Sequence, residues 1–409
     1  MNVREKLIDY MKSGIKESQV SSLGMEAEHF ILKKDTLEAV PYAGEGGIRE
    51  ILCRLMEAVE GSTAMPGKEL LGFTAPDYVI TLEPAAQLEI SINATDDISL
   101  IEKTYLEFLD TLKKVLTPYG YTYLAAGKQP VSKVRDLDLI PKERYVLMDR
   151  YFALTGTGGI EMMRGTCSVQ VSIDYFSAED FRRKIQAVSY YTPVFKLLMD
   201  NAPVFEGRPV QGHLSRTDTW NRTDPKRCGA LPGIFKEDYG FGDYADFLLD
   251  MPLIFMETKD GNYYTGERTV RDIYENRTPS TEDIIHIQSM AFPDVRAKRY
   301  LEIRSADSVP ARYATAYCAL IKGLLYNKEG LDYAQEQIRV NSLSREDILE
   351  SEQSLIQLGW DGLVYHKPVR EAAAEILRIA KDGLKEEEKH YLAPFEEVSE
   401  KGGIAGREE

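Results

Sequence analysis

Gly24-Met25-Glu26-Ala27-Glu28-His29-Phe30-Ile31-Leu32 has the pattern of a β-strand that carries two carboxylates two residues apart. Side chains alternate between the faces of a strand, so Glu26 and Glu28 project from one face and His29 from the other. Two like charges on one face repel each other unless a cation lies between them. The stretch therefore predicts a strand with one metal-binding face, and His29 is expected in the core.

Acids and one amide recur on other strand-like segments of the chain. Residues 78–82 and 87–92 have the pattern of a hairpin, and 166–173 and 299–304 that of two further strands. Hard divalent cations such as Mg²⁺ bind carboxylate oxygens and are completed by substrate phosphates, whereas zinc prefers the His and Cys that these segments nearly lack. We therefore expect one sheet face that binds Mg²⁺ and phosphate. The candidate metal ligands are Glu26, Glu28, Glu83, Glu89, Gln170 and Glu302.

Arginines near these segments supply the positive charge that phosphate binding needs. A guanidinium binds carboxylate or phosphate through two parallel hydrogen bonds. Glu302-Ile303-Arg304 places an acid and a guanidinium on one face of one strand, which suits a metal ligand beside a phosphate contact. In phosphoryl transfer, positioning and charge neutralisation carry most of the catalysis. The candidate arginines are Arg144, Arg164, Arg216, Arg299 and Arg304.

No pair of nucleophile and base stands out in the sequence. Cys167 lies within a predicted strand, so a packed thiol is favoured over a catalytic one. His213 lies near Arg216 in a polar stretch, where a structural role is favoured over a substrate contact. The chain has no C-x-x-C pair, so reduced and mostly buried thiols are expected. The cysteines are Cys53, Cys167, Cys228 and Cys318.

The order of elements favours an α+β fold with a mainly antiparallel sheet. Short turns join several strands, and strands and helices do not alternate as in a doubly wound fold. Residues 202–282 are expected to form long loops over a site, and 330–350 is a polar segment. Strands are also expected at 38–42 and 121–125, and the helix at 96–116 is expected on the outer face of the sheet. Helices are expected at 1–20, 48–59, 96–116, 178–201, 311–326, 369–384 and 386–401, with a kink at Pro193.

Composition limits the classes of function that remain. The 409 residues are 43% hydrophobic and show no linker or repeat, so one domain over 1–409 with a packed helical tail at 365–409 is expected. A net charge of −16 disfavours nucleic acid and anionic membranes as partners. The N-terminal segment is amphipathic and no run is apolar enough to span a membrane, so a cytoplasmic protein is expected.

Several stretches together resemble one known family, the plant and proteobacterial type of glutamate–cysteine ligase. They occur in the order of that family and extend from about residue 20 to 400. The matching stretches are Glu26-Ala27-Glu28-His29, Leu82-Glu83-Pro84-Ala85-Ala86-Gln87-Leu88-Glu89-Ile90-Ser91, Arg144-Tyr145-Val146-Leu147-Met148, Arg164-Gly165-Thr166-Cys167-Ser168-Val169-Gln170-Val171 and Arg299-Tyr300-Leu301-Glu302-Ile303-Arg304-Ser305-Ala306-Asp307.

The resemblance implies a glutamine-synthetase-like catalytic fold, in which a curved, mainly antiparallel sheet forms a cup backed by helices. It implies that ATP phosphorylates the γ-carboxylate of L-glutamate and that the amine of L-cysteine then displaces phosphate, the first step of glutathione biosynthesis. The partners would be these small molecules, and the protein a monomer or homodimer. By the family pattern, Glu26, Glu28, Glu83, Glu89, Gln170 and Glu302 would hold Mg²⁺. Glu302 and Arg304 would be catalytic, with Arg304 on the transferring phosphate, Arg144 and Arg216 on glutamate, and Tyr145 in the acceptor pocket.

Two positions depart from the family pattern. Ala85-Ala86 replaces Gly-Gly, and Ile254 in Met251-Pro252-Leu253-Ile254 stands where relatives have a tyrosine near the cysteine pocket. The second change leaves the acceptor amine open. Three alternatives therefore stay beside the main hypothesis: a glutamate ligase with another acceptor amine, a guanidino kinase, and a non-catalytic nucleotide-binding regulator.

Overall fold

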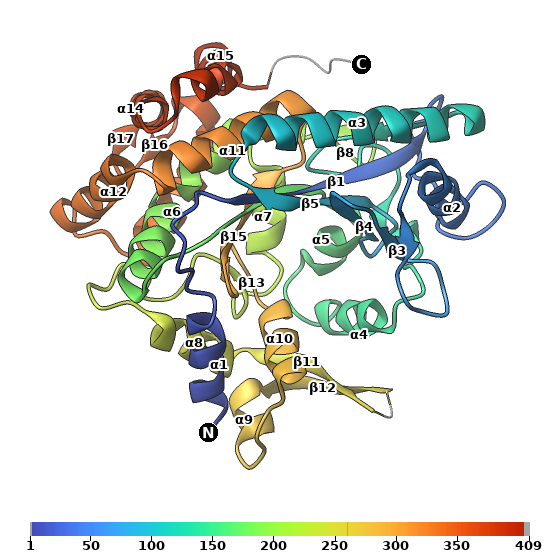
Figure 1. Ribbon diagram of the computed structural model, residues 1–409, viewed down its shortest axis with the longest axis horizontal. Helices are drawn as coiled ribbons and strands as arrows, with labels where there is room; N and C mark the ends of the chain where they lie inside the picture. Colours follow the sequence, from blue (N-terminus) through green and yellow to red (C-terminus); the bar gives the residue numbers. More distant parts are fainter. Residues whose placement is uncertain (1, 260, 405–409) are drawn as a thin grey trace.

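The central element of the computed structural model, which describes residues 2–259 and 261–404, is strand β1 (Leu23–Lys33). It lies inside a nine-stranded sheet with the order β14-β15-β7-β1-β5-β4-β3-β2, and β6 pairs with the second half of β1 (Figure 1). Every pairing in this sheet is antiparallel. The predicted α+β fold is therefore confirmed. The other strands are β2 (Thr63–Ala64), β3 (Gly72–Thr74), β4 (Tyr78–Leu82), β5 (Leu88–Thr95), β6 (Tyr121–Leu124), β7 (Ser168–Ile173), β14 (Val295–Ala297) and β15 (Leu301–Asp307).

One face of the sheet is apolar and packs against two helices. Ala27, Ile90 and Val171 lie on this face and are fully buried. Helices α3 (Ile98–Leu116) and α11 (Ala311–Leu325) lie together on this side, above the sheet in Figure 1. The predicted position of the first of these helices on the outer face is therefore confirmed.

His29 belongs to this apolar face, as expected. Its Nε2 lies 2.8 Å from the hydroxyl oxygen of Tyr105 on α3, and the imidazole is fully buried. Burial lowers the pKa of His29 to about 4, so the ring is neutral in the folded protein at neutral pH. The histidine next to the acidic pair is therefore a core residue that holds α3 to β1.

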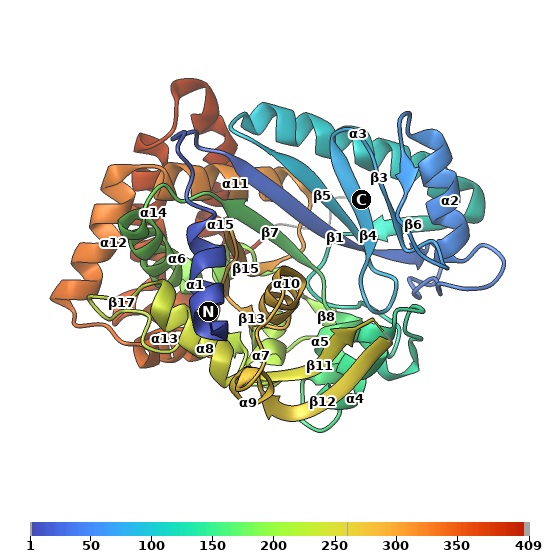
Figure 2. The same cartoon turned by 60° about the horizontal axis from the view of Figure 1, so that its bottom comes forward.

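The opposite face of the sheet is covered by elements from the middle of the chain. Figure 1 shows α4, α5, α7 and α10 below the sheet, and Figure 2 brings them forward together with the β11–β12 hairpin. Small strand pairs outside the main sheet are β8 (Val204–Phe205) with β9 (Arg208–Pro209), β10 (Cys228–Gly229) with β13 (Phe292–Pro293), β11 (Pro252–Thr258) with β12 (Gly261–Thr269), and β16 (Leu363–Val364) with β17 (Lys367–Pro368). The remaining helices are α1 (Val3–Lys12), α2 (Ile48–Ala58), η1 (Thr117–Tyr119), η2 (Val134–Asp136), α4 (Glu143–Phe152), α5 (Gly159–Gly165), α6 (Ala178–Leu198), α7 (Ser215–Asn221), α8 (Phe241–Asp250), α9 (Val270–Tyr274), α10 (Thr281–Ser289), α12 (Lys328–Val340), α13 (Arg345–Leu358), η3 (Gly359–Asp361), α14 (Val369–Asp382), η4 (Glu386–Leu392) and α15 (Ala393–Lys401).

The prediction of long loops over residues 202–282 was wrong, and the polar segment 330–350, for which no element was predicted, is largely helical. The first segment contains α7, α8, α9 and the β11–β12 hairpin instead of long loops, and the second lies in α12 and α13. Helices in polar sequence are hard to find by periodicity because few of their positions are apolar, as in α12, where Leu331, Ala334 and Ile338 are the buried apolar side chains. In α12 the cap is Asn327, whose side chain accepts a hydrogen bond from the Glu329 N–H at 3.2 Å.

Two shorter expectations also need correction. The first helix ends at Lys12 instead of residue 20. Gly14 follows it and lies so close to Arg299 that a Cβ there would be 2.2 Å from the Arg299 carbonyl oxygen. The expected strand at 38–42 is reduced to one bridge between Ala39 and Leu32. Helix α6 continues past Pro193 to Leu198.

The C-terminal helices α14 and α15 pack against α11. A buried ion pair between Lys322 of α11 and Glu388 of η4, at 2.5 Å, links the same two regions. Residues 405–409 of the expected tail lie outside the described residues, and the division into domains stays a prediction. Within the described ranges, no helix has the length and apolar character that a membrane crossing requires.

Candidate active site

Strands β5, β1, β7 and β15 place polar side chains on the face of the sheet opposite α3. Register puts Glu28 of β1 directly across from Glu89 of β5, and Glu26 across from Gln170 of β7. Glu302 of β15 pairs with Ser172 of β7 and so shares the same face. The predicted acids on these strands therefore lie on one surface because side chains alternate along each strand.

Glu28 is the most enclosed acid of the β1 pair. Its carboxylate accepts hydrogen bonds from the Ser168 N–H at 2.8 Å, the Ser168 Oγ at 3.0 Å and the Gln170 Nε2 at 3.2 Å. Burial raises the pKa of Glu28 well above its usual value, and the charges of Glu83 and Glu89 raise it further. Glu83, in the turn after β4, therefore lies close enough to join the acidic group.

Glu26 and Glu89 are half-buried, and their pKa values are raised as well. Burial, followed by the nearby charge of Glu302, raises the pKa of Glu26 to about 8. Burial and the charge of Glu83 raise the pKa of Glu89 to about 7, although the Thr81 hydroxyl donates a hydrogen bond to it at 2.7 Å. The face thus gathers carboxylates whose mutual repulsion a bound cation would relieve.

The donor set fits a hard divalent cation. In the side-chain arrangement of the described residues, no three His, Cys, Asp or Glu groups converge closely enough to hold a metal ion. The available donors are nevertheless carboxylate and amide oxygens, which suit Mg²⁺ and not zinc. Burial, and after it the charges of neighbouring carboxylates, raise the pKa values of Glu26 and Glu89, and a bound cation would favour their ionised forms. The oxygen donors of these side chains are therefore the feature that fits Mg²⁺.

Glu302 has a different environment, because three cations surround its buried carboxylate. Arg296 Nε lies 2.5 Å from Oε2, Lys298 Nζ 2.9 Å from Oε1, and Arg304 Nη1 3.2 Å from Oε2. These charges hold the pKa of Glu302 well below its usual range despite its burial. Arg304 Nη1 also donates to the Gln170 Oε1. Glu302 therefore fixes a group of cations at the edge of the acidic face.

Sequence reasoning missed Arg296 and Lys298. The chain between β14 and β15 turns at residues 298–300, so Arg296 lies directly opposite Glu302. The sequence could have indicated them. Arg296 and Lys298 are two residues apart, so they lie on one face, and a hairpin of β14 and β15 places that face beside Glu302. The prediction selected Arg299 instead, and that side chain contacts the Ser13 carbonyl oxygen at 3.2 Å, away from the acids.

Helix α4 brings Tyr145 and Arg144 to the Glu83 end of the face. The Tyr145 hydroxyl donates to the Leu82 carbonyl oxygen at 3.4 Å, and the ring is buried. Burial, with the charge of Glu83 next, raises the pKa of Tyr145 well above its usual value. Arg144 Nη2 donates to Ser289 Oγ of α10 at 3.4 Å. Tyr145 therefore lies near Glu83, whereas Arg144 lies against the Tyr145 ring, 6.0 Å from its centroid, and reaches toward α10.

Arg216 of α7 approaches the face from the other side. It is buried, and its Nη2 donates to the Arg304 carbonyl oxygen at 3.4 Å. Burial lowers the pKa of Arg216, whereas the charges of Asp307 and Glu28 raise it. The structure therefore brings Arg216, Arg304 and Glu28 together.

Three other candidates have structural partners elsewhere. Arg164 binds Asp149 at 2.7 Å and the Leu137 carbonyl oxygen at 2.7 Å. His213 Nδ1 lies 3.4 Å from Asp200. Cys167 is a buried free thiol, as are Cys228 and Cys318, while Cys53 is half-buried, so the expectation of reduced and mostly buried cysteines is confirmed.

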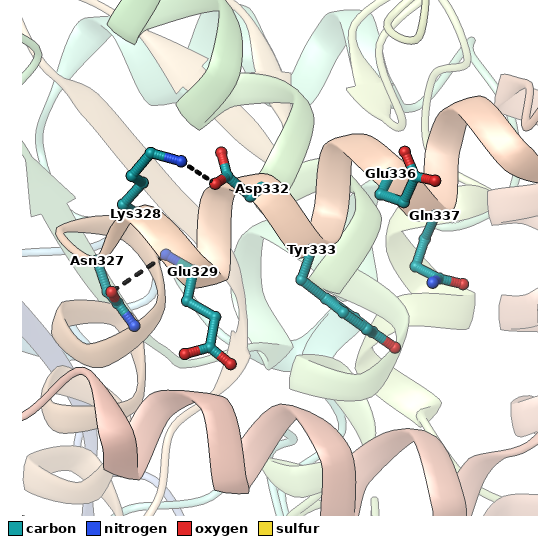
Figure 3. A pocket seen from close by; sticks show the side chains of 7 residues that line it. All are labelled: Asn327, Lys328, Glu329, Asp332, Tyr333, Glu336 and Gln337. Atoms are coloured by element: carbon teal, nitrogen blue, oxygen red, sulfur yellow. Dashed lines mark hydrogen bonds and ion pairs between the residues drawn. The ribbon is translucent and has the colours of Figure 1, made fainter.

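A separate surface depression runs along α12, at the side of the molecule away from α4 (Figure 1). Figure 3 shows mostly polar side chains projecting from one helix, with an ion pair between Lys328 and Asp332. It contains none of the acids of the sheet face and is lined by a single element. Its lining residues are Asn327, Lys328, Glu329, Asp332, Tyr333, Glu336 and Gln337.

Comparison with known proteins identifies relatives along almost the whole chain. The model of glutamate–cysteine ligase family 2 matches residues 22–408. The chain is 32% identical to the chloroplastic glutamate–cysteine ligase of Arabidopsis thaliana over 413 residues, which cover 98% of this chain and 77% of the relative. It is 31% identical to the chloroplastic enzyme of Medicago truncatula, over 93% of this chain and 75% of the relative. A glutamate–cysteine ligase from Francisella tularensis, solved in complex with AMP, shares the fold at a TM-score of 0.59 and 8% identity, over 94% of this chain and 82% of that chain.

Proposed function

The chain belongs to glutamate–cysteine ligase family 2, which makes it a carbon–nitrogen ligase, and we propose that its acidic sheet face joins the γ-carboxylate of L-glutamate to the amine of L-cysteine with ATP. The observation that carries the proposal is the placement of Glu26, Glu28, Glu89 and Glu302 on one face of adjacent antiparallel strands, beside Arg304. The corresponding reaction is the first step of glutathione synthesis.

Mg²⁺ would be held by the acids that lack a protein cation of their own. Glu26, Glu28 and Glu89 have raised pKa values, and Glu83 contributes to two of them, so these four are the proposed ligands. Gln170 lies between Glu28 and Arg304 and would contribute its amide. When bound, the cation would neutralise the charge of the ATP phosphates.

Glu302 would support the same site by holding cations in place. Both of its oxygens already face Arg296, Lys298 or Arg304, so its first role would be to orient Arg304 toward the transferring phosphoryl group. Because these donors are fixed before the reaction, they stabilise developing charge without a reorganisation cost. Direct metal ligation by Glu302 stays a prediction.

The reaction needs no nucleophile from the protein. An oxygen of the glutamate γ-carboxylate attacks the γ-phosphorus of ATP, the bond to the ADP oxygen breaks, and γ-glutamyl phosphate forms. The neutral amine then attacks the acyl carbon, phosphate leaves, and the amine loses a proton to complete the amide. Arg304 and Arg216 would bind the anionic groups of the substrates. The burial of the Cys167 thiol agrees with a reaction that uses no nucleophile from the protein.

By the family pattern, Ile254 stands where relatives have a tyrosine near the cysteine pocket, so this residue bears on the choice of acceptor amine. Ile254 is fully buried in β11 with a φ of 72°, at an irregularity opposite Gly266. An aliphatic side chain offers no hydrogen bond to a substrate carboxylate. This observation favours the second candidate, a glutamate ligase that accepts amines other than cysteine.

The test is an acceptor-amine screen with the purified protein, ATP, Mg²⁺ and glutamate, in which phosphate release and product mass are measured. We expect γ-glutamylcysteine as the main product. Equal stimulation by cysteine, alanine and 2-aminobutyrate would replace cysteine with a broader acceptor class. Phosphorylation of creatine or arginine without amide formation would favour a guanidino kinase, and nucleotide binding without turnover would favour a regulator. A cytoplasmic location and a monomeric or homodimeric state stay predictions.

A further inference from the structure

Lys128, in the segment between β6 and β7, is a buried cation outside the acidic face. Its backbone forms a bridge with Thr166, and the N–H of the next residue, Gln129, donates to the Gly165 carbonyl oxygen at 3.0 Å. The Lys128 side chain is almost fully buried. Lysine is almost never fully buried unless its ammonium is paired, so the partners of Lys128 indicate what it does.

The ammonium of Lys128 joins three separate elements. Its Nζ donates to Thr219 Oγ1 of α7 at 2.7 Å and lies 3.3 Å from Glu161 Oε2 of α5. It also lies 3.8 Å from the centroid of the Phe205 ring of β8. The buried Thr219 hydroxyl can in turn donate to Glu161 Oε2, 3.2 Å away, or to the Ser215 carbonyl oxygen, 3.1 Å away. Thr219 is therefore the point at which Lys128 holds α7.

Helix α7 depends on such contacts, because it is short and begins in a strained conformation. It has seven residues, and no side chain of the described residues caps its first turn. The residue before it, Leu214, has a φ of 51°, in the left-handed region that a leucine side chain disfavours. A short helix has little stability by itself. The orientation of α7 is therefore set by the contacts that hold its residues from outside.

Arg216 lies one turn before Thr219 on α7 and has few bonds of its own. Within residues 2–259 and 261–404, its Nε has no hydrogen-bond partner, and its Nη2 reaches the Arg304 carbonyl oxygen at 3.4 Å. Residues three apart in a helix lie on the same side, so Arg216 projects from the side of α7 that Lys128 holds. A displacement of Thr219 would therefore displace Arg216 as well.

The end of α7 is held by a different buried group. Asn221 Nδ2 donates to Glu352 Oε2 of α13 at 3.1 Å, and Lys196 Nζ of α6 donates to Glu352 Oε1 at 2.6 Å. The middle of α7 is thus held by Lys128 and its end by Glu352.

We propose that Lys128 is a positioning residue, which holds Thr219 so that α7 presents the Arg216 guanidinium to the acidic face. This assignment rests on the proposed ligase function, in which Arg216 binds an anionic group of glutamate. Lys128 itself contacts no substrate and takes no part in bond making. Its effect on the reaction should therefore pass through Arg216.

The first test is a double-mutant cycle between Lys128→Met and Arg216→Gln, with KM for glutamate as the readout. Methionine keeps an unbranched side chain without the charge, and Glu161 keeps Arg222 as its partner at 3.3 Å. Alone, Lys128→Met should raise KM for glutamate roughly 5- to 50-fold and change KM for ATP by less than about 2-fold, given the usual coupling between contacting groups. In the Arg216→Gln background it should add less than about 2-fold. An equal rise in both backgrounds would overturn the proposal.

Thr219 supplies a second test that removes no buried charge. Thr219→Val keeps the shape of the side chain but cannot accept the Lys128 hydrogen bond, whereas Thr219→Ser keeps the hydroxyl. The valine variant should raise KM for glutamate, and the serine variant should stay within about 2-fold of the wild type. Equal KM values in the two variants would show that the hydroxyl does not transmit the effect of Lys128, which contradicts the proposal.

Lys184→Met is the matched control. Lys184 of α6 is as buried as Lys128 and has similar partners, with Asp180 Oδ2 at 2.9 Å and the Phe176 ring centroid at 4.2 Å, and both partners lie outside α7. This variant should lower the unfolding temperature without a change in KM for glutamate. A rise in KM as large as that of Lys128→Met would attribute the effect to lost stability and would reject the positioning role.

Crystal structures of the wild type and of Thr219→Val separate this proposal from the proposed function. The distance from Arg216 Nη2 to the Arg304 carbonyl oxygen, 3.4 Å here, should increase in the variant. An Arg216 that keeps its position would overturn the positioning role, whatever reaction the protein catalyses. Wild-type protein without any amide-forming activity would instead contradict the proposed function itself.

Discussion

Glu28 of β1 and Glu89 of β5 lie directly opposite each other in the antiparallel register, with both carboxylates on the face that α3 does not cover. Like charges at opposed positions destabilise a sheet. Selection for folding stability alone would not retain such a pair, so the relationship indicates that the folded chain exchanges stability for a binding site.

The stability of the ligand-free protein should fall as pH rises. The pKa of Glu26 is raised to about 8 and that of Glu89 to about 7, so between pH 4.5 and those values the folded state binds more protons than the unfolded state. The free energy of unfolding then decreases with pH by at most about 1.4 kcal/mol per unit for each group. Urea unfolding at pH 5, 6, 7 and 8 in EDTA measures the slope, and Glu89→Gln should reduce it. An unchanged slope in this variant would show that Glu89 does not titrate as described.

Divalent cation should reverse this loss. Mg²⁺ binds the ionised acids, so its stabilising effect should be larger at pH 8 than at pH 6 and should reach about 2.7 kcal/mol at 100 times its dissociation constant. Thermal unfolding with and without Mg²⁺ measures the difference. Glu28→Gln should lose most of the stabilisation, whereas Asp110→Asn, in an exposed ion pair of α3, should keep all of it. Equal stabilisation of both variants would place the cation elsewhere.

Replacement of Glu302 should impair both folding and turnover. Glu302→Gln leaves Arg296, Lys298 and Arg304 without their shared buried carboxylate, which should cost about 3–5 kcal/mol of unfolding free energy. The rate constant kcat should fall by about 100-fold or more because Arg304 loses its orientation. Adding Lys298→Met should restore part of the stability but none of the activity. Activity that returns together with stability would show that Glu302 has only a structural role.

The turn between β4 and β5 should be strained at one alanine. Ala86 has a φ of 65°, in the left-handed region that an alanine side chain disfavours by about 1–2 kcal/mol. Ala86→Gly should therefore stabilise the protein by about 1 kcal/mol after the entropy cost of glycine is included. Ala85→Gly is the paired control, since Ala85 is not among the residues with positive φ, and it should destabilise by about 0.5–1 kcal/mol. Chemical denaturation of both variants decides the question.

Much of the sheet could be predicted from the alternation of polar and apolar residues along each strand. The residues of the candidate site could be predicted only in part. Alternation placed Glu26, Glu28, Gln170 and Glu302 on one face, because register carries a local pattern across neighbouring strands. The burial of Asp294 beside Lys196 had no such signal. Its carboxylate is held by Lys196 of α6, which also pairs with Glu352 of α13, and these contacts join segments far apart in the sequence.

Helices in polar sequence were the main failure of prediction. Only a few residues of α12 are apolar and buried. Its exposed face carries ion pairs such as that between Glu336 and Arg339, at 2.7 Å. Such pairs contribute little individually, so the helix depends on packing against α6. This tertiary contact is not visible in the local sequence.

The bond between Lys196 and Glu352 has a practical consequence for protein engineering. Glu352 belongs to α13, yet it shares the buried ammonium of Lys196 with the carboxylate of Asp294, which precedes β14. Trimming the chain before α13 to obtain a smaller biocatalyst would remove Glu352, and the buried Lys196 ammonium would lose one of its two carboxylate partners. A shortened enzyme would therefore need Lys196 redesigned at the same time, and grafting the sheet alone onto another scaffold would not transfer the activity.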